Sequence, residues 1–291
     1  MNFRSQAKIN LCIHLLEKRP DGYHELVTLM EAVDLADDLI INQQKTGTTV
    51  TCTNPVVPTD DRNLVVKAVN LVKRKYKLKD QGVSINIIKR IPVAAGLAGG
   101  SGNAAMTLHG LNRLWALGLK KEQLIELAAE LGSDVPFCLY GGAAIAFGRG
   151  EKVIWLDDPG TRHYVLICPP ISVSSGWAYS RVNLGLTKDR SSISLLSSVM
   201  QTDDLKKLIS CLNNDLEAVV SARFPEINRA RGYLTDNGVN GILMSGSGPA
   251  VFGLVSSRKS AERIASDVRN MVEPFWQVFA VSSIAREDED L

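Results

Sequence analysis

Apolar and polar residues alternate along "SQAKINLCIHLL" (residues 5–16), the first patterned segment of the chain. One face of such a strand is apolar and the other is polar: Ala7, Ile9, Leu11, Ile13 and Leu15 against Lys8, Asn10, Cys12 and His14. Asp21-Gly22 then indicates a turn, because glycine adopts positive φ without a Cβ clash. Strand-like sequence resumes after this turn, so a hairpin that carries Lys8 and Asn10 on its polar face is predicted.

Helical and strand patterns then follow one another. Apolar residues recur at helical spacing in 62–76 and 120–132, and residues 82–93 indicate a strand closed by Pro92. "IPVAAGLAGGSGNAA" (91–105) separates that strand from a further helical pattern over 103–118, and two more strands are predicted within 141–156. The first half of the chain is therefore expected to be an α/β domain.

The order of elements changes after "DDPGTR" (157–162), a polar turn that contains both Pro and Gly. A length of 291 residues suits two domains, and the expected division is 1–159 and 160–291. Beyond the boundary the patterns predict a strand over 163–170, helices near 203–213 and 226–236, strands at 241–244 and 250–255, a helix at 259–271 and a last strand at 275–284.

Composition excludes several classes of function. The 33 basic and 31 acidic residues give a net charge of +2, which lacks the basic excess of a nucleic-acid-binding protein. No apolar run approaches the ~20 residues of a membrane span, and the N-terminal segment lacks the layout of a signal peptide. The five cysteines are scattered and odd in number, as expected for reduced thiols in a cytoplasmic protein. We expect neither a nucleic-acid nor a membrane partner.

The glycine-rich stretch carries the clearest chemical signal. A loop between a strand and a helix N-terminus directs backbone N–H groups at an anion, and the helix dipole adds about half a positive charge. Close helix–sheet packing would also need small residues, but the four glycines of the loop together favour phosphate: Gly96, Gly99, Gly100 and Gly102. A side chain at Gly99 is expected to fill the space of phosphate oxygens and to be strained if the loop needs positive φ there.

Two common phosphate motifs do not fit this loop. No Gly-Lys-Ser/Thr occurs, so the P-loop pattern is absent. Residues 100–105 satisfy G-x-G-x-x-A, but the acidic residue that should follow about 20 positions later falls inside the predicted helix 120–132. We therefore reject a dinucleotide-binding domain.

The motifs of the chain resemble those of the GHMP small-molecule kinases. "PVAAGLAGGSGNAA" is similar to their central ATP loop, and "LMSGSGPAVFGLV" (243–255) is similar to their C-terminal glycine motif. "AKINLCIHLLEKRPDGYHEL" and "LGSDVPFCLYGGAAIAFGRGE" resemble the members that act on a cytidine diphosphate-linked methylerythritol. The resemblance covers most of the chain. It implies an α+β fold with an N-terminal ATP-binding domain, a ferredoxin-like C-terminal domain and an active site in the cleft between them.

The resemblance also implies an activity. It is ATP- and Mg²⁺-dependent phosphorylation of the 2-hydroxyl of 4-(cytidine 5'-diphospho)-2-C-methyl-D-erythritol, in the non-mevalonate isoprenoid pathway, by a monomer or homodimer. Two alternatives stay open: a family kinase that acts on homoserine or mevalonate, and a nucleotide-binding regulator that has lost catalysis. "GYHE" argues against the first, because those substrates have no base, and the pair Lys8 and Asp134 argues against the second.

The catalytic residues implied by the resemblance are Lys8 and Asp134. A carboxylate can accept the hydroxyl proton of the substrate, while an ammonium orients that hydroxyl and offsets the charge of the γ-phosphoryl group. Taken alone, Lys8 could be an exposed strand lysine and Asp134 a helix N-cap. The implied substrate-binding residues are Asn10, Tyr23, which would stack on cytosine, His24, which would bond its edge, and Ser175.

The ATP-binding residues implied by the resemblance form one continuous segment. They are Pro92, Val93, Ala94, Ala95, Gly96, Leu97, Ala98, Gly99, Gly100, Ser101 and Gly102. Relatives commonly carry Ser-Ser where this chain has Ser101-Gly102, which leaves Ser101 as the candidate hydroxyl for phosphate or Mg²⁺. No other metal ligand from the protein is expected.

Overall fold

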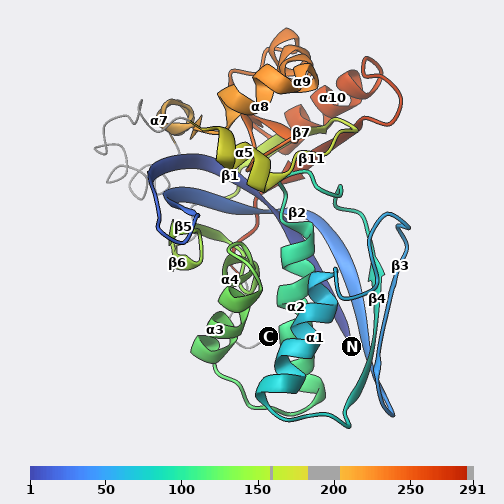
Figure 1. Ribbon diagram of the computed structural model, residues 1–291. Coiled ribbons are helices and arrows are strands. Elements are labelled where there is room, and N and C mark those ends of the chain that lie inside the picture. The colour runs from blue at the N-terminus through green and yellow to red at the C-terminus, as the bar shows by residue number, and fades with distance from the viewer. Residues whose placement is uncertain (158–159, 183–203, 287–291) are drawn as a thin grey trace.

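The computed structural model describes residues 1–157, 160–182 and 204–286, arranged as two stacked α+β bodies (Figure 1). The first body contains β1 (Asn2–Lys18), β2 (His24–Gln44), β3 (Thr48–Cys52), α1 (Leu64–Lys75), β4 (Gly82–Ile88), α2 (Gly99–Leu114), α3 (Lys121–Leu131), α4 (Val135–Cys138), β5 (Ala143–Gly148) and β6 (Lys152–Trp155). The second contains β7 (His163–Cys168), α5 (Ser175–Arg181), α7 (Leu205–Cys211), β8 (Asn213–Asn214), α8 (Glu217–Arg223), α9 (Pro225–Asp236), β9 (Gly241–Met244), β10 (Val251–Val255), α10 (Arg258–Arg269) and β11 (Gln277–Ser282).

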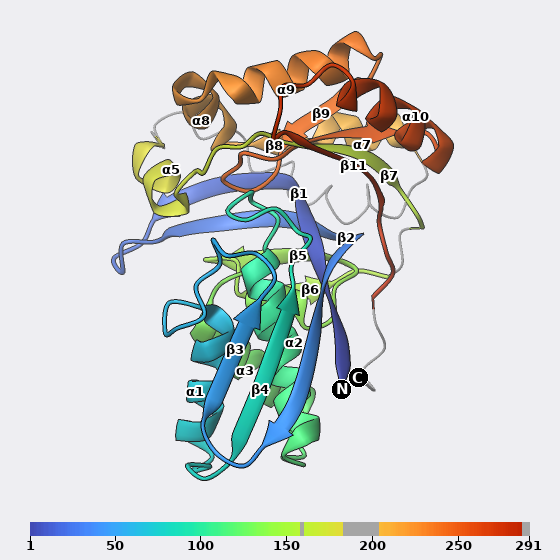
Figure 2. The same cartoon turned by 90° about the vertical axis from the view of Figure 1, so that its right-hand side faces the viewer.

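The β1–β2 hairpin organises the first body. Its antiparallel pairing runs from Asn2 opposite Ile40 to Lys18 opposite His24. The C-terminal part of β2 pairs with β4, and its N-terminal part pairs with β5. The main path of the sheet has the order β3-β4-β2-β1-β8. Figure 2 shows the hairpin curving from the lower body to the underside of the upper one. This curvature places the polar face of β1 at the junction of the two bodies.

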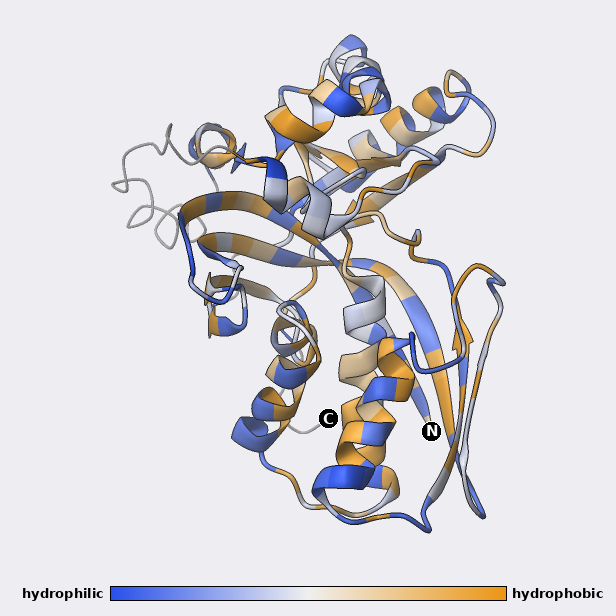
Figure 3. Cartoon of the chain, in the orientation of Figure 1, coloured by the Kyte–Doolittle hydropathy of each residue, from blue (hydrophilic) through white to orange (hydrophobic). Residues whose placement is uncertain are grey.

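Three helices, α1, α2 and α3, cover one face of this sheet. Their apolar stripes, visible in Figure 3, meet the inward residues of β2 and β4 in one core. Asn63 caps α1 by accepting a hydrogen bond from the Val65 backbone N–H, and Gly132 ends α3. The helices predicted within 62–76 and 120–132 are therefore confirmed.

The second body is a ferredoxin-like α+β sandwich, as expected. Its antiparallel sheet has the order β11-β7-β10-β9, in which β7 and β10 are central. The helices α8, α9 and α10 cover one face (Figure 2). Alternate residues on the other face, including Tyr164 and Phe252, pack against Ile9, Leu11 and Leu29 of the β1–β2 hairpin. The hairpin therefore belongs to the cores of both bodies.

Some boundaries differ from the sequence prediction. The strand expected over 82–93 ends at Ile88, and α2 begins at Gly99 rather than 103 because the glycines themselves form its first turn. The short elements α5, α8 and β8 were not predicted, and β8 pairs with β1 of the first body. Residues 158–159 lie outside the described ranges, so the boundary at 159/160 stays a prediction.

Two expectations from composition can be compared with the described residues. Within those ranges, every helix is too short or too polar to pass through a lipid bilayer. The five cysteines, all of which are described, are free thiols. Burial raises the pKa of the Cys12 thiol to about 12, with the Asp215 carboxylate and Cys211 adding to the effect, so this thiol is unreactive near neutrality.

Candidate active site

A cleft of about 1230 Å³ opens between the two bodies. Cavities for a single small ligand usually measure roughly 300–1,000 Å³, so this cleft is larger than such a site usually is. The predicted site residues that line it are Lys8, Asn10, Tyr23, His24, the loop from Pro92 to Ser101, Asp134 and Ser175. Gly102 does not line the cleft. An added Cβ there would meet the Ser5 hydroxyl at 2.5 Å, so Gly102 permits close packing of α2 on β1.

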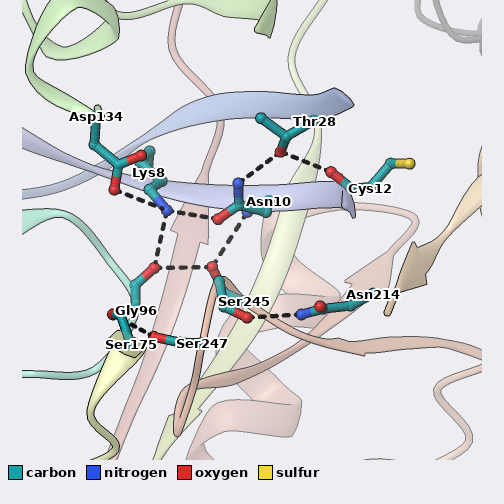
Figure 4. A network of polar contacts seen from close by, with 11 residues as sticks. Lys8, Asn10, Cys12, Thr28, Gly96, Asp134, Ser175, Asn214, Ser245 and Ser247 are labelled. Carbon is teal, nitrogen blue, oxygen red and sulfur yellow. Dashed lines mark hydrogen bonds and ion pairs between the residues drawn. The ribbon is translucent and has the colours of Figure 1, made fainter. Parts of the chain in front are cut away.

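Lys8 lies on the cleft side of β1 but is almost completely buried, at 3% exposure. Its ammonium donates hydrogen bonds to Asn10 Oδ1 at 2.5 Å and to the Gly96 carbonyl at 3.2 Å. Its third close partner is Asp134 Oδ2, at 3.6 Å (Figure 4). The alternative of an exposed strand lysine is therefore wrong, because three oxygen groups hold this ammonium at one point of the cleft.

Asp134 occupies the N-cap position of the short helix α4, as one interpretation of the sequence predicted. Its side chain nevertheless makes no capping hydrogen bond, and its carboxylate faces Lys8 instead (Figure 4). The Asp134 side chain is 37% exposed, so a ligand in the cleft can reach it. A carboxylate beside a fixed ammonium can accept a proton from an alcohol bound between them.

The glycine-rich loop is shaped by backbone conformations that are rare for L-residues. Ala94 and Ala98 have φ of 53° and 55°, and Gly96 has φ of 76°. Ala98 is the N-cap of α2, with no side-chain cap and no acidic residue in the first turn. The N-terminal N–H groups of this 16-residue helix therefore meet the cleft without an anionic partner from a side chain, which is the arrangement that binds phosphate.

Gly99 has a different role from the one predicted. Positive φ occurs at the preceding residue, Ala98, and not at Gly99, and a Cβ on Gly99 would lie 2.9 Å from Lys89 Nζ and 3.1 Å from Ile91. Gly99 thus makes room for protein groups rather than for phosphate oxygens. Gly100 is the open position, because its Cβ would have only Leu64 within 4 Å, at 3.9 Å.

A buried acidic residue fixes the start of this loop. Asp37 of β2 accepts hydrogen bonds from the backbone N–H groups of Arg90 and Ile91, at 2.7 and 2.8 Å. Lys89 Nζ donates to the same carboxylate at 2.8 Å. Sequence reasoning missed Asp37 and Lys89, because their spacing of about 50 residues carries no local signal.

The second glycine motif, between β9 and β10, contacts the first one directly. Ser245 Oγ accepts from the Asn10 backbone N–H and donates to the Gly96 carbonyl, both at 3.2 Å. A Cβ on Gly96 would lie 2.3 Å from the Ser245 carbonyl oxygen, so glycine is required at this position. The Ala250 N–H also donates to the Ala95 carbonyl at 3.2 Å. The two motifs therefore form one wall of the cleft.

Side chains from the second body complete this wall. Asn214 Nδ2 donates to the carbonyls of Met244 and Gly246, both at 2.8 Å, and so holds the second motif in place. Ser175 Oγ lies 2.8 Å from Ser247 Oγ at the cleft surface (Figure 4). The position of Ser175 in the cleft agrees with its predicted position.

An aromatic pocket lies around the turn of the hairpin. His24 is buried and stacks against Tyr179 of α5, with ring centroids 5.7 Å apart and planes at 30°. Burial, with a smaller contribution from Lys18, lowers the pKa of His24, so its ring is neutral at pH 7. Tyr23 is 53% exposed, and the Arg149 guanidinium lies 4.9 Å from its ring centre. Tyr179 was missed, because no helical pattern marked α5.

Comparisons with known proteins agree with this geometry. Residues 63–142 match the GHMP kinases N terminal domain, and residues 196–273 match the GHMP kinases C terminal domain. A 4-diphosphocytidyl-2-C-methyl-D-erythritol kinase of Brevibacillus brevis is 40% identical, with 100% of this chain and 99% of that protein covered. The kinase of the same name from Bacillus subtilis is 42% identical, covering 98% and 97%. The chain belongs to the GHMP kinases. It is a small-molecule kinase of that superfamily.

Solved structures place this GHMP kinase in the same fold. A crystal structure of a 4-(cytidine 5'-diphospho)-2C-methyl-D-erythritol kinase superposes with a TM-score of 0.81 at 31% identity, covering 97% of this chain and 99% of that one. A homoserine kinase from Cytophaga hutchinsonii gives a TM-score of 0.74 at 18% identity, covering 99% and 96%. The second likeness concerns the fold alone.

The GHMP kinase family implies ATP as phosphoryl donor, and ATP is used together with Mg²⁺. Among the described residues, no group of three or more His, Cys, Asp or Glu side chains could hold a metal ion. Asn103 Oδ1 in the first turns of α2 is buried without a hydrogen-bond partner there, and Asn103 lines the cleft near Ser101. Mg²⁺ typically takes one or two protein oxygens and completes its shell with phosphates and water. These two side chains fit that requirement.

Proposed function

We propose that this GHMP kinase transfers the γ-phosphoryl group of ATP to the 2-hydroxyl of 4-(cytidine 5'-diphospho)-2-C-methyl-D-erythritol, in the non-mevalonate isoprenoid pathway. Relatives named for this reaction support the proposal at 40–42% identity over nearly their whole length. One observation carries the proposal. The Lys8–Asp134 pair lines the same cleft as the uncapped N-terminus of α2 and the pocket formed by His24 and Tyr179.

In the proposed reaction the phosphates of ATP lie against the glycine-rich loop and the N-terminus of α2. Asp134 accepts the proton of the substrate hydroxyl as its oxygen attacks the γ-phosphorus. A new oxygen–phosphorus bond forms, the bond to the β-phosphate oxygen breaks, and ADP leaves. Lys8, held by Asn10 and Gly96, offsets the negative charge on the transferred group.

Mg²⁺, when bound with ATP, neutralises phosphate charge. Ser101 and Asn103 are the side chains that would hold it. Gly102, which replaces the second serine common in relatives, faces Ser5 of β1, so its lack of a hydroxyl removes no oxygen from the cleft.

The aromatic pocket would provide selectivity for the cytidine group. A neutral imidazole presents one N–H donor and one acceptor, which suits the mixed donor and acceptor edge of cytosine. Tyr179, beside His24, is half-buried and offers a stacking surface, and the exposed Tyr23 offers another at the rim. Homoserine and mevalonate have no base to fill this pocket.

The test is an assay of the purified protein with ATP and Mg²⁺ against three alcohols: the cytidine diphosphate-linked methylerythritol, homoserine and mevalonate. We expect kcat/KM for the first to exceed the other two by about 10⁴-fold, the discrimination of a site built to hydrogen-bond a polar group that the competing substrates lack. Preference for homoserine or mevalonate would overturn the assignment. The absence of turnover with all three alcohols would favour the alternative of a nucleotide-binding regulator that has lost catalysis.

Size-exclusion chromatography separates a monomer from a homodimer, and cell fractionation tests the cytoplasmic location we infer.

A further inference from the structure

Thr28 of β2 bridges an irregularity in β1 beside the catalytic lysine. The β1–β2 pairing shifts register between Asn10 and Cys12, where a β-bulge interrupts β1. The Thr28 hydroxyl contacts both sides of this bulge, at 2.8 Å from Asn10 Nδ2 and 2.7 Å from the Cys12 carbonyl (Figure 4). Thr28 is buried and has no direct contact with the Lys8 ammonium.

The hydrogen count at this hydroxyl determines the orientation of the Asn10 amide. A threonine hydroxyl has one hydrogen to donate, whereas a backbone carbonyl can only accept. The Thr28 hydrogen is therefore used on Cys12, and Thr28 must accept its other bond from Asn10. The atom of Asn10 that faces Thr28 has to be the NH₂ group, so Asn10 Oδ1 faces Lys8.

The opposite orientation would expel the lysine. It would place the Asn10 NH₂ group 2.5 Å from Lys8 Nζ, where an ammonium and an amide donor repel each other. Lys8 would then keep only the Gly96 carbonyl and the more distant Asp134 carboxylate as partners. The position of the ammonium thus depends on which way an uncharged amide points.

We propose that Thr28 is a positioning residue of the kinase: it fixes the Asn10 amide so that Asn10 holds the Lys8 ammonium in line for phosphoryl transfer. The proposal rests on the proposed role of Lys8 in transfer but does not depend on which alcohol is phosphorylated. Thr28 lines the cleft beside Asn10, and we expect it to act on turnover through its hydrogen bond to Asn10.

The test compares Thr28→Val with Thr28→Ser by steady-state kinetics. Valine has the shape of threonine without the hydroxyl, so we expect kcat to fall by about 10- to 100-fold, the range for losing a hydrogen bond to a charged group. The KM for ATP should change less than kcat. Serine keeps the hydroxyl and should stay within about threefold of the wild type. Equal losses with valine and serine, or a wild-type kcat with valine, would overturn the proposal.

Thr107→Val is the matched control. Thr107 is also a buried threonine that donates to a backbone carbonyl, that of Asn103 at 2.7 Å. Calorimetry should show a similar loss of melting temperature for both valine variants, with kcat lowered only by Thr28→Val. A comparable fall in kcat for Thr107→Val would attribute the effect to destabilisation and would overturn the proposal.

A double-mutant cycle with Asn10→Ala separates positioning from a general structural role. In the Asn10→Ala background, adding Thr28→Val should lower kcat by a further factor of less than about three. The effects of two residues that act through one another are not additive. Full additivity would contradict the proposal. The cycle is run with whichever of the three alcohols the wild-type enzyme phosphorylates, so that a wrong acceptor assignment and a wrong role for Thr28 give different results.

Discussion

The ammonium of Lys8 lies 3.6 Å from the carboxylate of Asp134, and the same ammonium donates to the Gly96 carbonyl of the glycine-rich loop. The ion pair is asymmetric in its exposure, because the Lys8 side chain is buried while a third of the Asp134 side chain meets solvent. A substrate alcohol can therefore approach the carboxylate, whereas the ammonium is held in advance of binding. This asymmetry suits a fixed electrostatic group beside an accessible proton acceptor.

Asp134→Asn should lower kcat by about 10²- to 10⁴-fold, the usual contribution of a positioned general base. The amide keeps the shape of the carboxylate and removes the proton acceptor, so the fold and the affinity for ATP should be retained. Stopped-flow or coupled assays give kcat, and calorimetry gives ATP affinity. Lys8→Met should also lower kcat. The double variant should lose less kcat than the product of the two single fold-losses. Near-normal turnover in Asp134→Asn would contradict the assignment.

The sequence predicts much of this site, because its motifs are contiguous. The alternation of β1 put Lys8 and Asn10 on one face, and the glycines marked the start of α2 even though the first turn was placed four residues too late. The contributions of Asp37, Thr28 and Tyr179 were not predictable in this way. Each acts across a distance in the chain that only folding closes, and none stands in a local pattern that favours one chemistry.

The Gly99 prediction shows a second limit. Composition correctly indicated that the loop needs small residues, but it could not assign the reason for each glycine. In the structure Gly99 accommodates Lys89 and Ile91, while the left-handed conformations fall partly on alanines, Ala94 and Ala98. Which side of a loop faces a helix and which faces a cleft depends on tertiary packing, and the local sequence does not encode it.

Gly99→Ala and Gly100→Ala form a matched pair that separates these roles. The Gly99 variant should force Lys89 away from Asp37, which lowers stability and raises the KM for ATP, because the start of the loop loses its anchor. Gly100→Ala has open space at its Cβ and should unfold at or above the wild-type melting temperature, since helical alanine is favoured over glycine by roughly 0.5–1 kcal/mol. Thermal unfolding that ranks the two variants in the reverse order would show that the loop packs differently.

The lowered pKa of His24 predicts a pH dependence of substrate binding. Burial favours the neutral ring, so its folded pKa lies below the ordinary value near 6.5. The KM for the cytidylated substrate should be constant above neutrality and should rise as pH falls through this lowered pKa, when the ring loses its acceptor.

His24→Ala should raise KM by about 2- to 12-fold, from the ~0.5–1.5 kcal/mol of one hydrogen bond. The same variant should abolish the rise of KM at low pH. If KM still rises at low pH in His24→Ala, a group other than His24 causes that rise.

Tyr179→Ala tests the stacking surface that the sequence did not predict. Base–aromatic stacking is worth about 1–3 kcal/mol, so KM for the cytidylated substrate should rise by about 5- to 150-fold while ATP affinity is unchanged. Tyr23→Ala is the comparison, and we expect a smaller effect because Tyr23 lies at the exposed rim. A larger effect of Tyr23 would place the base at the rim of the cleft instead of beside His24.

A buried ion pair joins the two bodies, and its loss should lower the free energy of unfolding. Glu31 of β2 accepts a hydrogen bond from Arg162 at 3.0 Å and another from the Tyr164 hydroxyl, and both partners belong to the second body. Arg162→Met leaves the Glu31 charge buried with one partner fewer, which should lower the free energy of unfolding by about 3–5 kcal/mol. Arg263→Met, which breaks the exposed pair with Asp267, should cost less than about 1 kcal/mol.

The double variant Glu31→Gln/Arg162→Met decides whether the charge itself is responsible. Glutamine can still accept from Tyr164 but carries no charge, so the double variant should recover part of the stability lost in Arg162→Met. Urea unfolding followed by tryptophan fluorescence measures all three proteins under the same conditions. If the double variant is less stable than Arg162→Met alone, then Arg162 stabilises the junction through packing of its side chain, and the two bodies are joined mainly by the apolar contacts of the hairpin.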